Sequence, residues 1–434
     1  MVPSVRKIPL WFLGFLILGF TNISCLKSTK PGIPPDVLKV LNETGFNRIE
    51  LTKTIAGYIG TTDTLKLKGA YFLISNMHRQ YYVDFKVYDS NNNMYEIGPL
   101  SFQTDSTFLA YWNALDLITG GLRFKANIFM LDTDTITSSI LSSRIDRCLD
   151  TITNAYLNHF TRESVFQYVL PYRIANEAIE NWQEILLYEY PDLFRSNKSV
   201  SSDSMIRLID DLVEDQFRFD GRFVKQSSVQ KTDQLIRLGR GSHEDLAQLK
   251  VKMLRTAGIP ATIDYTPYLN DSVNGFHWAV AMNSSGVFVP LIPEKCRFLF
   301  SKQNTKIPKI YRRVYAIQPN SLFRSKDISF YTPPFLGHYD YLDVTREYFD
   351  VVQLQVKTTQ SDTVIYVTVF NDGNWKAIDH AYAGNKGYWF YNLRSAIEYR
   401  PAVFRNDSLM LLNQASGVFQ KSKSAYNYDD AGFR

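Results

Sequence analysis

The chain has 434 residues, which gives room for two or three domains, and hydrophobic residues make up 45% of it, as in a globular protein. The net charge is only +5, and the Lys and Arg residues form no dense basic block. These values give no support for disorder or for nucleic-acid binding.

The first 24 residues predict a signal peptide. Arg6 and Lys7 precede an apolar run over residues 8–20. A run of this length is too short to cross a bilayer comfortably, and a basic start followed by a short apolar core is typical of secreted proteins.

The end of this run resembles the cleavage site of a bacterial lipoprotein. Ser24 stands directly before Cys25, although Asn22 occupies the position where Leu is usual. We therefore expect lipidation at Cys25, a polar tether over residues 25–35, and a cell-envelope location facing the periplasm or the exterior. The alternative is an ordinary secretory signal and a secreted protein.

Residues 36–160 are expected to form a mostly helical N-terminal region. Apolar residues recur at helical spacing in "PDVLKVLNETG" and in "SILSSRIDRCLDTITNAYLNHF". Between these two segments, "YYVDFKVYDSNNNMYEI" favours a short hairpin with "SNNN" as its turn. No repeat of fixed period is present, which argues against a solenoid.

Residues 161–325 predict a core of helices followed by strands. Two helical patterns flank "LPYR", since Pro171 cannot continue the first helix. A strong helix over residues 243–257 then precedes three runs rich in β-branched and aromatic residues, "ATIDYTPYL", "FHWAVAM" and "GVFVPLI". This order of elements indicates an α+β core.

Residues 326–434 are openly β in pattern. The runs "VVQLQVK", "DTVIYVTVF", "GYWFYNL" and "EYRPAVF" are separated by turns at "NDGN" and "AGNKG". The alternation within "TVIYVTVF" is typical of a sandwich strand. The fold class expected for the whole chain is α+β, with a C-terminal β-sandwich-like domain.

The helix over residues 243–257 has clear boundaries in the sequence. Ser242 is a good N-cap and Asp245 lies three residues on, which is an Asp version of the capping box. Gly258 and Pro260 end the helix. The apolar stripe that follows from helical spacing is Leu246, Leu249, Met253 and Leu254.

This stretch and its neighbours resemble the transglutaminase-like core, a papain-type fold. In that family a glycine-led stretch carries the nucleophilic Cys, with Asp two residues later, a helix ending "R-x-x-G-I-P", and a strand with His-x-Trp. The matching residues are Gly241, Asp245, Ala247, Arg255, Gly258, Ile259, Pro260, His277 and Trp278. The "VLPYR…NW" and "VFNDGNWKAID" blocks also resemble transglutaminase-like lipoproteins of Bacteroidetes-type bacteria.

Two of the three catalytic positions that the resemblance implies carry other residues. His243 stands at the position of the Cys, and Ile292 stands where the third residue, an Asp, is expected. Glu294, two residues on, is a candidate to replace that Asp. Only His277 is retained, so the resemblance implies a papain-like core without the family's thiolate.

Other residues are weaker candidates for the site. Trp278, Asp245 and Arg173 are candidates for binding, although an ordinary salt bridge is the better expectation for Arg173. Ser242 is a poor nucleophile because its oxygen caps the helix. Cys148 and Cys296 are expected to be buried small residues, and nothing local indicates that Cys296 reaches the site. Surface or core roles are expected for the remaining histidines, His380 among them.

The leading functional hypothesis is a pseudoenzyme anchored to a membrane by its N-terminal lipid. It would use the old cleft, with the β domain, to bind a peptide, glycan or cell-wall partner, without cofactor and without nucleic acid. The alternative is an active hydrolase or transferase centred on His243 and His277, which together with a carboxylate could hold a metal ion. A third reading is a structural envelope protein whose cleft is filled by its own side chains.

Overall fold

The computed structural model describes residues 32–155, 160–196, 200–226, 228–269, 275–301, 304, 307–322, 334–358, 364–384, 386–395, 397–405, 408–412 and 416–421. The predicted signal peptide and the lipidation site at Cys25 lie outside these ranges and stay predictions. Within them, no helix is both long and apolar enough to cross a membrane.

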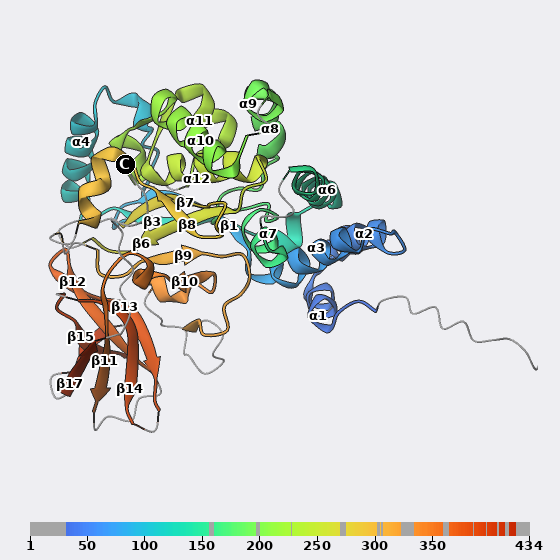
Figure 1. The fold of residues 1–434 in the computed structure, drawn as a ribbon. Helices are drawn as coiled ribbons and strands as arrows, with labels where there is room; N and C mark the ends of the chain where they lie inside the picture. Colours follow the sequence, from blue (N-terminus) through green and yellow to red (C-terminus); the bar gives the residue numbers. More distant parts are fainter. Residues whose placement is uncertain are drawn as a thin grey trace, which may run out of the picture.

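The N-terminal region is mostly helical, as predicted; α1, α2, α3 and α6 lie on one side of the core and α4 on the other (Figure 1). Apolar side chains of α1, α2, α3 and α6 belong to the same hydrophobic cluster as the core, whereas Phe108 and Trp112 of α4 pack in a smaller separate cluster. The helices are α1 (Pro35–Glu43), α2 (Arg48–Tyr58), α3 (Thr64–Ser75), η1 (Met77–Arg79), η2 (Pro99–Ser101), α4 (Asp105–Ile118), α5 (Asp132–Thr135) and α6 (Ser138–Ala155).

A three-stranded sheet accompanies these helices, in the order β2–β1–β3. The strands are β1 (Tyr81–Tyr88), β2 (Met94–Tyr95) and β3 (Arg123–Leu131). The hairpin expected in this segment is confirmed, since Val87 pairs with Tyr95 across the turn. The sequence did not predict β3, an edge strand whose side chains are exposed along almost its whole length and therefore lack the alternation of a half-buried strand.

The core places one long helix, α12 (His243–Thr256), between other helices and a sheet (Figure 1). The polar groups on its buried flanks are paired. Lys250 and Lys252 are each 2% exposed, and their ammonium groups contact Asp210 and Glu180, respectively. The other helices of the core are α7 (Arg162–Tyr168), α8 (Trp182–Glu189), α9 (Pro191–Ser196), α10 (Ser202–Gln216), η3 (Gly221–Lys225) and α11 (Thr232–Leu238).

The core sheet is antiparallel, in the order β10–β9–β6–β7–β8. Alternate residues of β7 serve two cores: Ala279 and Ala281 pack into the cluster that contains α12, whereas Trp278 and Val280 pack into a second, aromatic cluster. The elements are β6 (Ala261–Thr266), β7 (Phe276–Met282), β8 (Phe288–Leu291), η4 (Glu294–Phe300), β9 (Tyr311–Arg313), η6 (Pro334–Gly337), β10 (Tyr341–Asp343) and η7 (Thr345–Glu347). The core sheet thus extends past residue 325.

The C-terminal β region contains two antiparallel sheets, in the orders β14–β11–β17 and β13–β12–β15–β16. Side chains from both sheets, including Val356 and Val367, share one hydrophobic cluster, as the expected sandwich requires. The strands are β11 (Val351–Lys357), β12 (Val364–Asn371), β13 (Asn374–Tyr382), β14 (Tyr388–Arg394), β15 (Arg400–Arg405), β16 (Ser408–Leu411) and β17 (Ser416–Lys421). The α+β fold class is confirmed.

Candidate functional site

The start of α12 is held by the capping box that the sequence predicts. The Asp245 backbone N–H donates to Ser242 Oγ at 3.1 Å, and the Ser242 backbone N–H donates to Asp245 Oδ2 at 2.7 Å. The Ser242 hydroxyl also donates to this carboxylate, at 2.8 Å, so it is engaged in the cap. The backbone and side-chain amides of Gln230 add two further bonds to Asp245.

Gly241 allows this close packing before the helix. A Cβ at this position would lie 2.7 Å from Gln230 Nε2 and 2.8 Å from Asp245 Cβ, closer than real Cβ contacts. Gly241 belongs to β5 (Arg240–Gly241), which runs parallel to β4 (Arg218–Phe219) and pairs with it. Through this pairing the chain brings Phe219 beside the first residue of α12.

His243 is enclosed by aromatic rings. Its imidazole stacks on Phe219 with ring centroids 4.1 Å apart, and the edge contact with Phe276 is at 5.1 Å. The pKa of His243 is lowered to about 4. Burial is the main cause; Glu214 raises the pKa, and the nearby His277 and Lys250 lower it. His243 is therefore neutral at pH 7, and its Nδ1 is buried without a hydrogen-bond partner among the described residues.

Cys296 lies at this site, contrary to the expectation from sequence. Its Sγ is 3.9 Å from His243 Nε2, and it is half-buried on η4. The contact joins residues 53 positions apart, so no local pattern could have predicted it. Burial is the main cause that raises the pKa of the Cys296 thiol, which makes thiol and imidazole a neutral pair rather than a thiolate–imidazolium pair.

His277 lies on the face of β7 that packs toward α12, together with Ala279 and Ala281. Its ring stacks on Tyr265, its partner in the neighbouring strand, at 5.5 Å. Burial lowers the pKa of His277, with Glu244 opposing and Arg313 reinforcing the effect. His277 is close enough to His243 to lower its pKa electrostatically, but no hydrogen bond joins these two imidazoles in the described structure.

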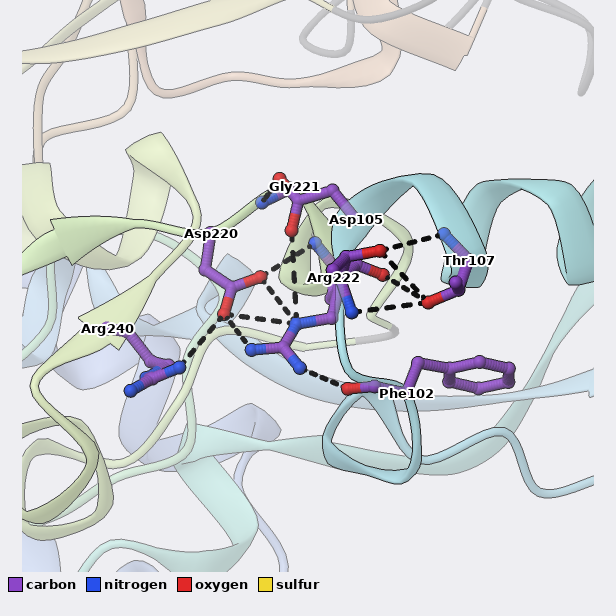
Figure 2. Close-up of polar contacts among 8 residues, drawn as sticks. Phe102, Asp105, Thr107, Asp220, Gly221, Arg222 and Arg240 are labelled. Atoms are coloured by element: carbon purple, nitrogen blue, oxygen red, sulfur yellow. Dashed lines mark hydrogen bonds and ion pairs between the residues drawn. The ribbon is translucent and has the colours of Figure 1, made fainter.

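A second polar network fixes the segment that carries Phe219 (Figure 2). The Arg222 guanidinium donates to both oxygens of Asp220, at 2.6 Å from Nη2 and 2.9 Å from Nε, and to the backbone carbonyl of Phe102. Asp105, in the first turn of α4, accepts from the Gly221 backbone N–H at 2.9 Å. This network ties the N-terminal region to the short β4–β5 pair and so holds the Phe219 ring over His243.

The candidate third catalytic residue, Glu294, forms no hydrogen bond or ion pair with His243 or His277 in the described structure. The chain leaves β8 at Leu291, and Glu294 begins η4 as an exposed residue with no contact to His277 in the described structure. Ile292, at the position of the family Asp, is buried in the aromatic cluster. The three catalytic candidates are therefore not brought together as a triad.

The three candidate binding residues are occupied by structural contacts. Trp278 is 1% exposed and donates from Nε1 to the Tyr348 hydroxyl at 3.0 Å. Arg173 forms a buried ion pair with Asp132 and donates to backbone carbonyls nearby. Asp245 holds the cap, and burial raises its pKa against the hydrogen bonds that lower it.

A metal site finds no geometric support in this region. Among the described residues, no group of three His, Cys, Asp or Glu side chains is arranged to hold a metal ion. The two histidines supply at most two ligands, and Asp245, which could add a carboxylate, already accepts four hydrogen bonds.

The comparisons with known proteins give one family match and one weak structural match. Residues 193–291 match the family model of the transglutaminase-like superfamily, so the chain contains a domain of this type, with α12, β6, β7 and β8 inside it. No curated protein matches. A crystal structure of a putative protease from Parabacteroides distasonis matches with 14% identity and a TM-score of 0.21, over 40% of this chain and 29% of that one. The match thus spans less than a third of that protein.

Proposed function

We propose that this chain is a lipid-anchored envelope protein whose transglutaminase-like domain binds a peptide, glycan or cell-wall partner without thiolate chemistry. One observation carries the proposal. The position that would hold the nucleophile at the start of α12 is His243, a neutral imidazole closed in by Phe219 and Phe276. An imidazole with a pKa of about 4 supplies neither a thiolate nor a positive charge at neutral pH.

A cavity beside the cap gives such a domain room for a ligand. It has a volume of 440 Å³ and lies between β1 of the N-terminal region and the segment before α11. This volume is within the usual range for small-ligand sites, roughly 300–1,000 Å³. Lys86, Lys225 and Lys231 line it together with Glu96, which pairs with Lys86 at 3.5 Å, so the lining has a net positive charge and an anionic group such as a peptide carboxylate suits it. Gln230 lines it too and links it to Asp245.

The decisive experiment restores the missing thiol. His243→Cys, made in a Cys296→Ser background, places a thiol at the first residue of α12, where the helix dipole stabilises a thiolate. We expect iodoacetamide to alkylate it at pH 6.5 on the order of tenfold faster than an ordinary cysteine. The parent chain should neither hydrolyse, cross-link nor deamidate Gln-containing peptides. Turnover of such peptides by the parent would refute the proposal.

The contact between Cys296 and His243 favours one alternative, a hydrolase or transferase that uses this thiol. Its raised pKa argues against it, but the geometry makes it testable. In that case Cys296→Ser would abolish turnover of Gln-containing peptides, whereas Cys148→Ser would not, since Cys148 is fully buried. Tightly bound metal that is lost in His243→Ala would instead support the metal-assisted form.

The anchoring part of the proposal is tested separately. Bacterial cells that express the chain are labelled with radioactive palmitate and then fractionated. We expect the label and the protein together in the membrane fraction, and neither with Cys25→Ala. Unlabelled protein in the medium would point instead to simple secretion.

A further inference from the structure

A second pocket lies in the C-terminal β region, away from the transglutaminase-like domain. It has a volume of 660 Å³ and forms where the edge strands β13 and β14 of the two sheets meet residues 319–321. Its polar lining includes Asp343, Asp379 and His380, and its aromatic lining is Tyr382, Trp389 and Tyr391. None of these residues belongs to the site around His243.

A buried lysine balances the two carboxylates of this pocket. Lys309 is 0% exposed, and its ammonium contacts Asp343 at 2.8 Å as well as Asp379. It also donates to the backbone carbonyl of Tyr391 at 3.1 Å, which uses all three of its protons. The carboxylates keep unused lone pairs and remain about a fifth exposed, so they can accept hydrogen bonds from a ligand.

The Nδ1 atom of His380 accepts no hydrogen bond from any described residue. Its imidazole hydrogen-bonds to the backbone of Asn320, which assigns the proton to Nε2, because Nδ1 is buried without a partner. Nδ1 lies 3.8 Å from Asp379 Oδ1, and the side chain is 9% exposed. Burial lowers the pKa of His380, so at neutral pH two acceptors face each other with no hydrogen between them. Nδ1 is closed to solvent, whereas the Asp379 carboxylate stays about a fifth exposed and can accept a hydrogen bond from a donor such as a hydroxyl.

The aromatic side chains give the pocket a flat apolar surface. Trp389 and Tyr391 alternate on β14 and therefore lie on one face, with ring planes only 18° apart and centroids 6.4 Å apart. Tyr391 is 52% exposed and Tyr382 40% exposed, so both rings together with Trp389 present apolar surface to the pocket. Such a platform suits the apolar C–H face of a ring that carries hydroxyls on its edge.

We infer that this pocket binds a neutral saccharide, whose hydroxyls donate to Asp343 and Asp379 and whose ring face lies on Trp389 and Tyr391. Lys309 neutralises one of the two carboxylate charges and leaves one, so a cationic ligand is the competing possibility, which the experiment below includes as a comparison. The described side chains also form no group that could hold a metal ion.

The test measures binding of neutral trisaccharides to the purified full chain by calorimetry. The probes are chitotriose, cellotriose, maltotriose and mannotriose, with trilysine as the cationic comparison. We expect at least one saccharide to bind, with affinity at least about tenfold weaker in Trp389→Ala and in Tyr391→Ala. The matched control is Phe370→Ala, an exposed ring on β12 outside the pocket, which should bind like the parent.

Three results would overturn the inference: none of the saccharides binds, trilysine alone binds, or a saccharide binds equally well to the parent and to both ring variants. Thermal unfolding of each variant shows that it is folded, and Tyr391→Ala removes a half-exposed ring while keeping the backbone contact with Lys309. The outcome is independent of the thiol experiment on His243, so failure of one proposal leaves the other standing.

Discussion

His243 and His380 each keep a buried Nδ1 without a hydrogen-bond partner, yet their surroundings differ. The faces and edge of His243 are covered by Phe219, Phe276 and the Cys296 thiol. His380 lines an open pocket with carboxylates and exposed aromatic rings. The imidazole at the position that resembles a catalytic centre is thus packed by its own neighbours, whereas the pocket beside His380 presents partly exposed carboxylates and aromatic rings to a ligand.

The side chains of the two regions therefore serve different purposes. Around α12 the cap, the apolar stripe and the flanking ion pairs stabilise the fold whether or not any chemistry occurs. In the β pocket the ring side chains of Trp389 and Tyr391 contribute little to any core, so stability does not explain their presence. Substitutions should therefore cost stability at the first region and binding at the second.

The largest effect is expected for Asp245→Ala. Its carboxylate accepts four hydrogen bonds, and removing it leaves the backbone N–H groups of Gln230 and Ser242 without these acceptors, whereas the Gln230 side-chain amide keeps its bond to the Arg240 carbonyl. We expect the free energy of unfolding to fall by about 3 kcal/mol, measured by urea titration of the helical circular dichroism. Asp233→Ala, in the exposed first turn of α11, is the matched control and should change it by less than about 0.5 kcal/mol. Equal losses in both variants would contradict the role of the cap.

The elements around α12 were predictable because their signals are local. The helix was expected over residues 243–257 and is found at His243–Thr256, and "FHWAVAM" is β7 without change. Caps, glycine stops and β-branched runs act within a few residues, so a single sequence displays them. The sandwich strands β11, β12, β14 and β15 were predicted for the same reason.

The parts that were not predicted depend on tertiary contacts. The approach of Cys296 to His243 depends on how η4 folds back after β8, and the stacking of Phe219 depends on a two-residue strand pair. The pocket at His380 joins residues from three separate segments, so the sequence around His380 predicted only a surface or core role. Geometry of this kind has no signature in local periodicity.

A second prediction tests burial of His243 through pH. Its pKa is about 4 in the folded state and about 6.5 in the unfolded chain, so the unfolded state binds the proton first as the pH falls. The free energy of unfolding should therefore decrease between pH 6.5 and 4, by about 2 kcal/mol after allowance for partial exposure. His243→Gln should lack this part of the decrease, while the other histidines contribute equally to both proteins. Identical pH profiles for the two would show that His243 is solvated.

A third, smaller effect is expected for Phe219→Ala. The ring is 46% exposed but covers one face of His243, so its removal should cost about 1 kcal/mol and let water reach the imidazole. The pKa of His243, followed by NMR titration of its ring protons, should move up toward 6.5 because burial is the main cause of its depression. Phe298→Ala, an exposed ring on η4, is the control and should leave that pKa unchanged. An unchanged pKa in Phe219→Ala would show that Phe276 and the helix alone bury His243.

The smallest effect on stability is expected for Tyr391→Ala, a variant that should lose much of its saccharide binding. Tyr391→Ala removes a ring that is 52% exposed, while its backbone carbonyl keeps the bond from Lys309. We expect the free energy of unfolding of the β region to change by less than about 0.5 kcal/mol, as for an ordinary surface substitution. Thermal unfolding followed by tryptophan fluorescence measures it. A loss of several kcal/mol would mean that the ring belongs to the sandwich core, and the contrast between the packed site at His243 and the open pocket beside His380 would then disappear. If the free energy of unfolding is unchanged, stability does not explain the exposed ring at position 391, as expected for a side chain that serves ligand recognition.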